Sequence, residues 1–251
     1  MKENLKKKIL EGKSCFGMYV SLTDPSIIEM AALAGYDFVR IDWEHSMMNQ
    51  ETIFNMIRVA NLVSLPVFVR VSSLDGATRL LDAGVTGIMV PHVSSREKAI
   101  EAVNEIKYAP LGGRGMYGSA PALEFGNIKL GEFCKYANDE VFIVAQIEDK
   151  EGVENIDEIL SVEGIDMVAT GKNDLSQSYG HPGEPTHPEV LAAEARVIQK
   201  GLEYGKIPTL LCNSKARVEE LEKMGAHCFM TGRDVVFLFN GMKKAMETYK
   251  G

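Results

Sequence analysis

The sequence is poor in cysteine: four occur in 251 residues, and no two of them stand in a Cys-x-x-Cys spacing. Scattered cysteines favour reduced, mostly structural thiols over a disulfide framework or a zinc site, so we expect a cytoplasmic protein. Long apolar runs are also absent, because no stretch approaches the roughly 20 residues that a membrane-spanning helix needs. The first eight residues are mostly charged and no apolar segment follows them, so we expect no signal peptide and no membrane association.

Positive charge is scarce as well. Lysine and arginine number 27 against 35 aspartates and glutamates, which gives a formal net charge of −8. Proteins that bind nucleic acid present a basic face, and this balance argues against such a partner. The composition, 45% hydrophobic and 25% charged, is typical of a soluble globular protein. The length fits one large α/β domain, so we expect residues 1–251 to form a single unit.

What the sequence does contain is a repeated alternation of helix, glycine and apolar strand. Predicted helices end at Gly35, Gly84, Gly164 and Gly225, and a short apolar run follows each glycine. This alternation indicates a parallel sheet. The predicted strands are Cys15–Val20, Phe38–Asp42, Val67–Val71, Gly87–Pro91, Val141–Glu148, Met167–Gly171, Thr209–Cys212 and Cys228–Thr231. The predicted helices include Lys2–Gly12, Glu51–Val63, Ala77–Ala83, Arg96–Ile106, Pro188–Tyr204, Lys215–Met224 and Val235–Tyr249.

Eight strands, each followed by a helix, favour a closed (β/α)8 barrel of the TIM type over an open doubly wound sheet. No Gly-x-Gly-x-x-Gly fingerprint follows any strand, which also argues against a dinucleotide-binding sheet. One connection, from Lys107 to about Asn127, is long and rich in glycine. Loops of this length inside compact domains are usually functional or mobile.

Two apolar runs end on acids. Val141–Glu148 is nearly continuously apolar and stops at Glu148, and Ile165–Asp174 repeats the pattern. A carboxylate that closes a buried strand is costly unless a positive charge meets it. If the two runs are neighbouring parallel strands, Glu148 and Asp174 converge at the carboxyl ends, where barrel enzymes place their chemistry. Glu148 alone is as readily an exposed loop acid, but the pair predicts a site for a divalent cation.

Other strand ends add acids, a fixed cation and a histidine to the same face. Asp42, Glu44 and His45 follow the second strand, and Arg70 ends the third. His45 alone is more often a structural histidine, and Arg70 can merely balance the acids. Asp82 stands in the last turn of its helix, where the helix dipole disfavours an acid, so a partner is suggested. Four histidines are interpreted as structural or surface residues: His92, His181, His187 and His227.

Oxygen ligands without thiolate or imidazole select Mg²⁺ or Mn²⁺, with Co²⁺ as a substitute in vitro. Two protein ligands leave coordination positions open, and an arginine beside them suits a 2-oxo acid that binds through its carboxylate and keto oxygen. Polarising this carbonyl acidifies the neighbouring carbon and stabilises an enolate. A histidine base held by an aspartate completes an aldol or retro-aldol catalyst.

A set of motifs runs through the chain from about Leu5 to Met246. They are Asp42-x-Glu44-His45, Arg70, Arg79-Leu-Leu-Asp-Ala-Gly84 leading to Val90-Pro91, Gly113-Arg114-Gly115, Gln146-Ile-Glu148, Gly171-x-x-Asp174-Leu-Ser176 and His187-Pro188-Glu189. In order and spacing they resemble the HpcH/HpaI aldolase family, metal-dependent pyruvate aldolases that act on 4-hydroxy-2-oxo acids and 2-keto-3-deoxy sugar acids. The resemblance implies a phosphoenolpyruvate/pyruvate-binding type of barrel, whose last helix packs on a neighbouring subunit of a trimer-based hexamer. It also implies pyruvate and an aldehyde as the small-molecule partners.

The resemblance assigns roles to individual residues. Glu148 and Asp174 are implied to bind the metal, with Asp42 and Glu44 beside the metal waters. Arg70 is implied to steady the keto or enolate oxygen.

Proton transfer and substrate binding are assigned in the same way. His45 with Asp82 is implied to move protons. Gln146 and Gly171 are implied to line the pyruvate site, where the backbone N–H groups of Asn173 and Asp174 hold the carboxylate.

This chain departs from the family pattern in two places. The family usually has Gly-Pro-Ala-Asp at the second ligand, whereas this chain has Gly171-Lys-Asn-Asp174, and an Asn-Asp-Pro-like turn is replaced by Leu74-Asp75-Gly76. Lys172 raises the alternative of a Schiff base with the ketone. Nearby acids keep a lysine charged, so we expect Lys172 to tune charge or to point outward.

Three other functions share parts of this pattern. A citrate-lyase-β-like acyl-CoA lyase needs a basic groove for the CoA phosphates, and the sequence contains no such cluster. A non-catalytic sensor of 2-oxo acids does not need the complete set of acids, arginine and histidine. Decarboxylation of a substrate such as oxaloacetate uses the same enolate chemistry and is expected as a side activity.

Overall fold

Eight parallel strands form a closed barrel, in the order β1 to β8 with β8 returning to β1. The computed structural model describes residues 4–250, so Lys2 and Glu3 of the predicted first helix lie outside the described residues. The strands are β1 (Cys15–Val20), β2 (Phe38–Asp42), β3 (Val67–Arg70), β4 (Gly87–Val90), β5 (Phe142–Ile147), β6 (Met167–Thr170), β7 (Ile207–Leu211) and β8 (Cys228–Arg233). The predicted (β/α)8 barrel is confirmed.

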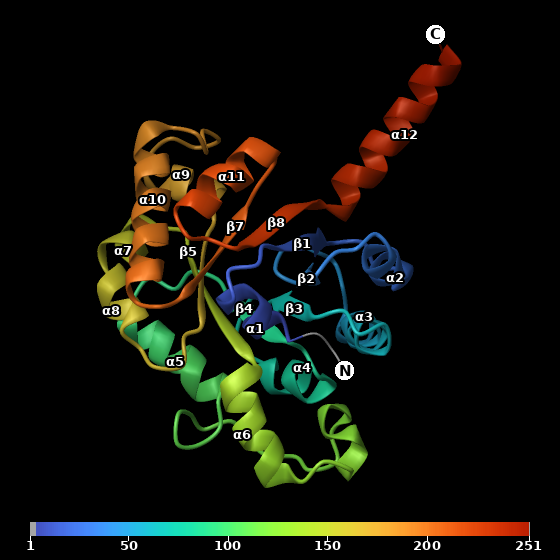
Figure 1. Ribbon diagram of the computed structural model, residues 1–251, viewed down its shortest axis with the longest axis vertical. Helices are drawn as coiled ribbons and strands as arrows, with labels where there is room; N and C mark the ends of the chain where they lie inside the picture. Colours follow the sequence, from blue (N-terminus) through green and yellow to red (C-terminus); the bar gives the residue numbers. More distant parts are fainter. Residues whose placement is uncertain (1–3, 251) are drawn as a thin grey trace.

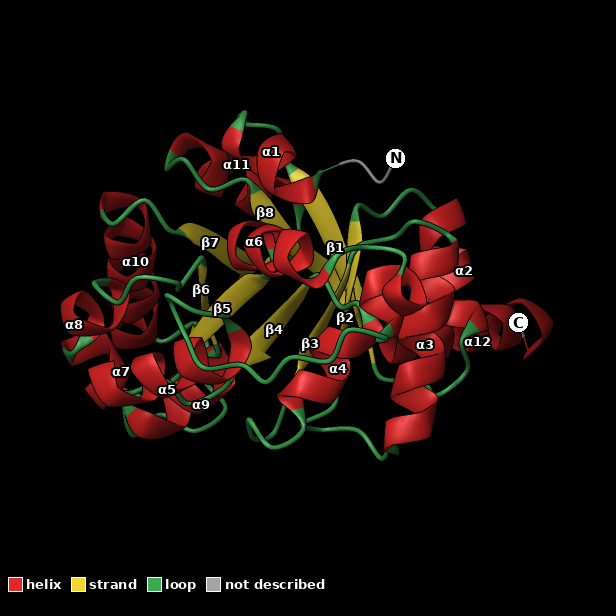
Figure 2. Ribbon diagram, turned by 90° about the horizontal axis from the view of Figure 1, so that it is seen from below, coloured by secondary structure: helices red, strands yellow, loops and turns green. Residues whose placement is uncertain are grey.

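Most of the helices lie around the outside of the barrel, whereas the last one projects away from it (Figures 1 and 2). The helices are given in chain order. They are α1 (Leu5–Leu10), α2 (Ser26–Leu33), α3 (Gln50–Leu62), α4 (Ala77–Ala83), α5 (Arg96–Ile106), the 3-10 helix η1 (Pro121–Gly126), α6 (Leu130–Glu140), α7 (Lys150–Glu154), α8 (Ile156–Leu160), α9 (Lys172–Ser178), α10 (Pro188–Glu203), α11 (Lys215–Lys223) and α12 (Asp234–Lys250). No helix in this described part of the chain is both long and apolar enough to span a bilayer.

Aromatic rings fill the barrel interior at the amino-terminal ends of the strands. Phe68 lies between Phe38 and Phe142, with ring centroids 5.5 Å from each, and all three side chains are buried. Gly17 and Gly87 leave room for these rings, because a Cβ at either position would collide with Phe38 or Phe68. The layer closes the floor of the barrel, so the opposite end forms its mouth.

An unpredicted cation lies above this floor. Arg40 is 1% exposed and donates to the Tyr19 hydroxyl at 3.2 Å and to Thr209 Oγ1 at 3.0 Å. Its guanidinium also stands over the rings of Tyr19 and Phe68. Such contacts with ring faces favour a cation.

The last strand contains a β-bulge that redirects its final residue. Between β1 and β8 the register passes from Gly17 opposite Met230 to Tyr19 opposite Arg233. β8 therefore contains one more residue than β1 over this interval, which is a β-bulge. Gly232 lies in this segment with φ of +151°, a conformation that favours glycine. The shift turns Arg233 to the Tyr19 side of the sheet, where its guanidinium lies 5.1 Å from the Tyr19 ring centroid.

Helix α12 leaves the barrel instead of lying against it (Figure 1). Its large apolar side chains are exposed, including Phe239 at 67% and Met242 at 57%. A groove beside β1 and β8 is lined by Phe16, Val218 and Thr231, together with residues at the start of α11. The barrel wall therefore lacks the cover that an eighth outer helix would provide.

Candidate active site

The mouth of the barrel is organised by a buried ion pair between neighbouring strands. Asp42 and Arg70 end β2 and β3 at paired register positions. The guanidinium donates to both carboxylate oxygens, from Nε at 3.1 Å and Nη2 at 2.6 Å. Burial raises the pKa of Asp42, but hydrogen bonds and charge from Arg70 outweigh it, and the net pKa is lowered. The pair is therefore charged and fixed in orientation.

Glu44 gathers three cationic or titratable groups around one carboxylate. Its Oε2 lies 3.2 Å from Arg70 Nη1 and 3.5 Å from His45 Nε2. Its Oε1 lies 3.6 Å from His92 Nε2. Both imidazoles are more than half exposed at the mouth, whereas the Glu44 side chain is 11% exposed. This arrangement orients two histidines that remain accessible to a substrate.

Glu148, directly after β5, is the most buried acid at the mouth, with its side chain 1% exposed. Its Oε1 accepts the backbone N–H of His92 at 2.8 Å, and Gln146 Nε2 donates to its Oε2. Burial, together with the charges of Asp174 and Glu44, raises the pKa of Glu148 to about 6, although the hydrogen bond and charge of His92 lower it. The groups around the Glu148 carboxylate therefore do not fully compensate its negative charge.

Two features around Glu148 fit an additional bound group. Gln146 Oε1 is buried and has no hydrogen-bond partner within residues 4–250. Gly171 provides a cradle, because a Cβ there would collide with Glu148 Oε2 and Gln146 Nε2. The carboxylates of Glu148 and Asp174 are hard oxygen donors, so this set of side chains fits a divalent cation such as Mg²⁺ or Mn²⁺.

Asp174 reaches the mouth from a helix and not from a strand. Strand β6 ends at Thr170, and α9 begins at Lys172, so the predicted run Ile165–Asp174 is interrupted. Asp174 lies exposed in the first turn of α9, and its charge acts on Glu148. The convergence of the two acids agrees with the sequence-based expectation, although the element that carries Asp174 differs from it.

The same helix turn places Asn173 and Asp174 at the free amino end of α9. The first turn of a helix has backbone N–H groups without intrahelical partners, and such groups favour an anion. Asn173 is exposed beside Asp174. The predicted role of these N–H groups toward a carboxylate thus has a suitable local geometry.

The structure separates two residues that the sequence analysis grouped as a dyad. Asp82 lies in the last turn of α4, and Arg114 Nη2 donates to it at 2.7 Å. Arg114 in turn is joined through its backbone to Lys107, whose side chain binds Val141 O at the start of β5. Asp82 is therefore at the amino-terminal end of the barrel, and His45 is at the mouth. The predicted dyad does not form within one chain.

Lys172 forms a salt bridge with Glu194, not with the acids at the mouth. Its Nζ lies 3.3 Å from Glu194 on α10, a side chain that is 2% exposed and also paired with Arg217 at 2.8 Å. The lysine points toward α10, as the outward-pointing alternative predicted. The amine that a Schiff base would need is thus engaged in a salt bridge away from the mouth, which disfavours Schiff-base chemistry.

Sequence reasoning missed two residues at the mouth. His92 was interpreted as structural, yet its Nδ1 lies 3.2 Å from Glu148 and its φ of 52° is unusual for a residue other than glycine. Its position two residues after β4 could have indicated this, because Glu148 was selected by its place after a strand. Arg233 reaches Tyr19 only through the bulge in β8, which no local sequence signal revealed.

Comparisons with known proteins agree with this geometry. The family model described as HpcH/HpaI aldolase/citrate lyase matches residues 15–241. A pyruvate aldolase of Rhizobium etli is 33% identical, covering 95% of this chain and 94% of the relative. A 4-hydroxy-2-oxo-heptane-1,7-dioate aldolase of Escherichia coli is 34% identical, covering 95% of this chain and 91% of the relative. The crystal structure of the citrate synthase SbnG has a TM-score of 0.91 and 33% identity, covering 98% and 97% of the two chains.

Proposed function

The chain belongs to the HpcH/HpaI aldolase/citrate lyase family, and from this premise we propose that it is an aldehyde-lyase that cleaves a 4-hydroxy-2-oxo acid into pyruvate and an aldehyde. One observation carries the proposal. The mouth combines a buried, charge-deficient Glu148 near Asp174 with the fixed Asp42–Arg70 pair. Glu148 and Asp174 suit a divalent cation, and Arg70 suits a keto oxygen. Enolate formation needs both, a cation to polarise the carbonyl and a donor to stabilise the oxyanion.

The proposed cofactor is Mg²⁺ or Mn²⁺, with Glu148 and Asp174 as its protein ligands and Asp42 and Glu44 near its waters. The unpartnered Gln146 Oε1, the Gly171 cradle and the raised pKa of Glu148 support this assignment. When bound, the cation would supply a Lewis acid that polarises the 2-oxo carbonyl.

The protein groups are proposed to position and protonate the substrate. Arg70 keeps N–H donors on Nη1 and Nη2 for the substrate keto oxygen, while Asp42 holds the guanidinium in place. His45 removes the proton of the 4-hydroxyl group. The C3–C4 bond then breaks, its electron pair forms the pyruvate enolate, and the aldehyde departs. Return of the proton to C3 gives pyruvate.

A pyruvate-release assay with 4-hydroxy-2-oxo acid donors tests the proposal. Chelation should abolish release, and Mg²⁺ or Mn²⁺ should restore it. Glu148→Ala and Asp174→Ala should lose metal binding while the fold survives.

Arg70→Lys should lower turnover by about 10²–10³, since a point charge does not replace a planar oxyanion donor. Full activity in the chelated protein would contradict the proposal, and Arg70→Lys turnover within a few-fold of wild type would remove Arg70 from the mechanism.

The likeness to a citrate synthase favours a second candidate. Citrate synthesis joins the enolate of an acetyl thioester to oxaloacetate, which requires the same kind of oxyanion stabilisation. Incubation with acetyl-CoA and oxaloacetate separates the candidates, because citrate should form only if this second function holds. Acetyl-CoA with pyruvate tests a citrate-lyase-like acyl-CoA reaction in the same way.

We also propose that the chain assembles with copies of itself, as a trimer-based hexamer in the cytoplasm. The exposed apolar side chains of α12 and the groove beside β1 and β8 support an exchange of this helix between copies. The groove lies where the barrel wall lacks an outer helix. Residues 4–250 contain no disulfide among the four cysteines, which supports the proposed location.

A further inference from the structure

We propose that the loop between α9 and α10 carries a second metal site, for a transition metal of the Zn²⁺ type, held by His181, Glu184 and His187. This site shares no residue with the cation site at the mouth. It does not depend on the proposed aldolase activity, because it rests only on the geometry of the loop.

Successive turns bring the three side chains together. The N–H of Glu184 donates to His181 O at 3.0 Å, and the N–H of His187 donates to Glu184 O at 2.9 Å. Each bond spans three residues, so the side chains repeat on one side of the loop. The N–H of His181 also donates to Ser176 O at 2.7 Å, which ties the loop to α9.

The loop is held in this conformation by its own sequence. Pro182, Pro185 and Pro188 each restrict the backbone, and Gly180 and Gly183 adopt φ of +83° and +82°. Both restrictions reduce the number of conformations that the segment can adopt. Binding to such a preorganised loop costs less conformational entropy than binding to a loop that must first become ordered.

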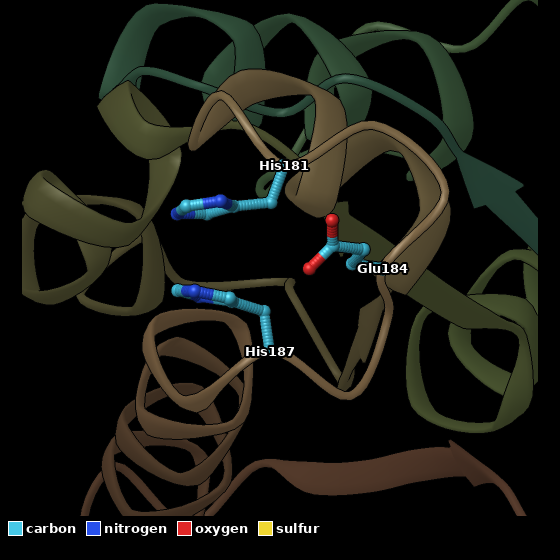
Figure 3. Close-up of side chains that lie close together, drawn as sticks. All are labelled: His181, Glu184 and His187. Atoms are coloured by element: carbon cyan, nitrogen blue, oxygen red, sulfur yellow. The ribbon is translucent and has the colours of Figure 1, made fainter.

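The side chains form a compact set of metal-binding atoms. The imidazole rings of His181 and His187 are stacked, with centroids 3.4 Å apart and an interplanar angle of 19°. Figure 3 shows the Glu184 carboxylate beside the two rings. One candidate ligand atom from each of the three residues lies within 4.8 Å of the others.

A second carboxylate, in the first turn of α10, contacts both imidazoles. Glu189 Oε2 lies 2.7 Å from His181 Nε2 and 3.8 Å from His187 Nδ1. Glu189 therefore contacts both imidazoles from outside the group formed by His181, Glu184 and His187. His181 and His187 are only partly exposed, with 28% and 26% of their side chains accessible, so the cluster is not fully solvated.

The donor types define the class of metal. Imidazole with carboxylate suits Zn²⁺, Ni²⁺ or Cu²⁺, whereas Mg²⁺ prefers oxygen ligands and retains its water. The competing interpretation is a loop held only by the hydrogen bond between His181 and Glu189.

The experiment measures zinc binding with the mouth site disabled. The full-length Glu148→Gln variant, in excess Mg²⁺, is titrated with Zn²⁺ by calorimetry, and its unfolding temperature is recorded with and without zinc. We expect one zinc per chain and a higher unfolding temperature. Adding His181→Gln or His187→Asn should weaken zinc binding by more than about tenfold, since loss of a supporting group alone costs about 10–100-fold.

The two substitutions are chosen to preserve the loop. Glutamine at position 181 can still bond to Glu189, and asparagine at position 187 can still cap α10, as the present His187 does. His227→Gln, a histidine at the start of β8, is the matched control and should leave zinc binding unchanged. Cu²⁺ bound to the Glu148→Gln protein should also show nitrogen couplings in its electron paramagnetic resonance spectrum.

Two results would overturn this site. One is a Glu148→Gln protein that binds no zinc, and the other is zinc binding that survives both loop substitutions unchanged. Pyruvate release in Mg²⁺ is measured in parallel for His181→Gln alone. Retained release with lost zinc binding would separate the loop site from the proposed aldolase site.

Discussion

At the scale of single residues, Glu148 shows how burial sets the conditions under which a cation can bind. Its pKa is raised to about 6 from an ordinary value of 4.5, first because the carboxylate is buried. The folded protein without metal therefore takes up a proton between these two values, and this group contributes less stability as the pH rises through that interval. A cation needs the ionised form, so it competes with that proton.

We predict that affinity for Mn²⁺ falls as the pH drops below about 6, by about tenfold per pH unit, because protonation of Glu148 blocks the ligand. Calorimetric titration of the protein with Mn²⁺ between about pH 5 and 8 measures this dependence. Gly171→Ala, which fills the cradle beside Glu148, should weaken Mn²⁺ binding across the whole range. An affinity that is flat down to about pH 5 would remove Glu148 from the ligand set.

His45 and His92 provide a matched pair for locating the proton-transfer group. Both approach Glu44, but only His92 also contacts Glu148. With metal at saturation, His45→Gln should lower kcat by about 10²–10⁴, the usual contribution of a general base. His92→Gln should affect kcat less and metal affinity more. Equal losses of kcat in both variants would show that His92 shares the proton transfer.

At the scale of elements, the bulge in β8 determines where Arg233 points. A Cβ at Gly232 would collide with the ring of Phe237 at the start of α12. We predict that Gly232→Ala lowers the free energy of unfolding by about 1–3 kcal/mol, the typical cost of a strained backbone conformation. Denaturant unfolding measures the change.

Gly131→Ala in α6 is the control for that substitution. No atom lies near the added Cβ, and alanine is a better helix former than glycine, so stability should rise by up to about 1 kcal/mol. A Gly232→Ala protein as stable as wild type would show that β8 can adopt another register there.

The barrel was predictable from sequence because its signal is repeated. Each strand is a short apolar run, several of them directly after a glycine that ends a helix, and all eight appear in the structure close to their predicted bounds. The pairing of Asp42 with Arg70 follows from their equivalent positions on neighbouring strands.

The remaining differences depend on tertiary contacts. Helix α9 starts inside a run that looks like one strand, and the bulge in β8 is compatible with many sequences. The partner of Asp82 is Arg114, 32 residues further along the chain. The sequence around Asp82 does not show whether its partner is Arg114 or His45.

At the scale of the whole molecule, α12 is long, amphipathic and without cover. Val236, Phe239, Met242 and Met246 are all exposed, between 47% and 67%. A stripe of this kind is costly in water and is typical of a surface that another chain covers. In the proposed oligomer, the groove beside β1 and β8, which Phe16 and Val218 help to line, is the candidate surface for this stripe.

We predict that the protein elutes from gel filtration as an oligomer, most simply a hexamer, and that Phe239→Glu converts it to smaller species. A charge on the apolar stripe cannot be buried without a partner. Light scattering measures the mass. Asn240→Glu, a change at a neighbouring polar position of α12, should leave the mass unchanged. A wild-type mass near 27.6 kDa would show that the chain is a monomer.

The ring layer of Phe38, Phe68 and Phe142 closes the barrel interior at the amino-terminal ends of the strands, so the mouth is its open end. Reactants and products must therefore pass through the same opening, and whatever lies deeper must enter first and leave last. If pyruvate binds at Arg70 and the aldehyde lies above it, as proposed, cleavage releases the aldehyde before pyruvate. Product inhibition should then be competitive for pyruvate against the donor acid and noncompetitive for the aldehyde. The closed floor of the barrel thus imposes a kinetic order on the reaction.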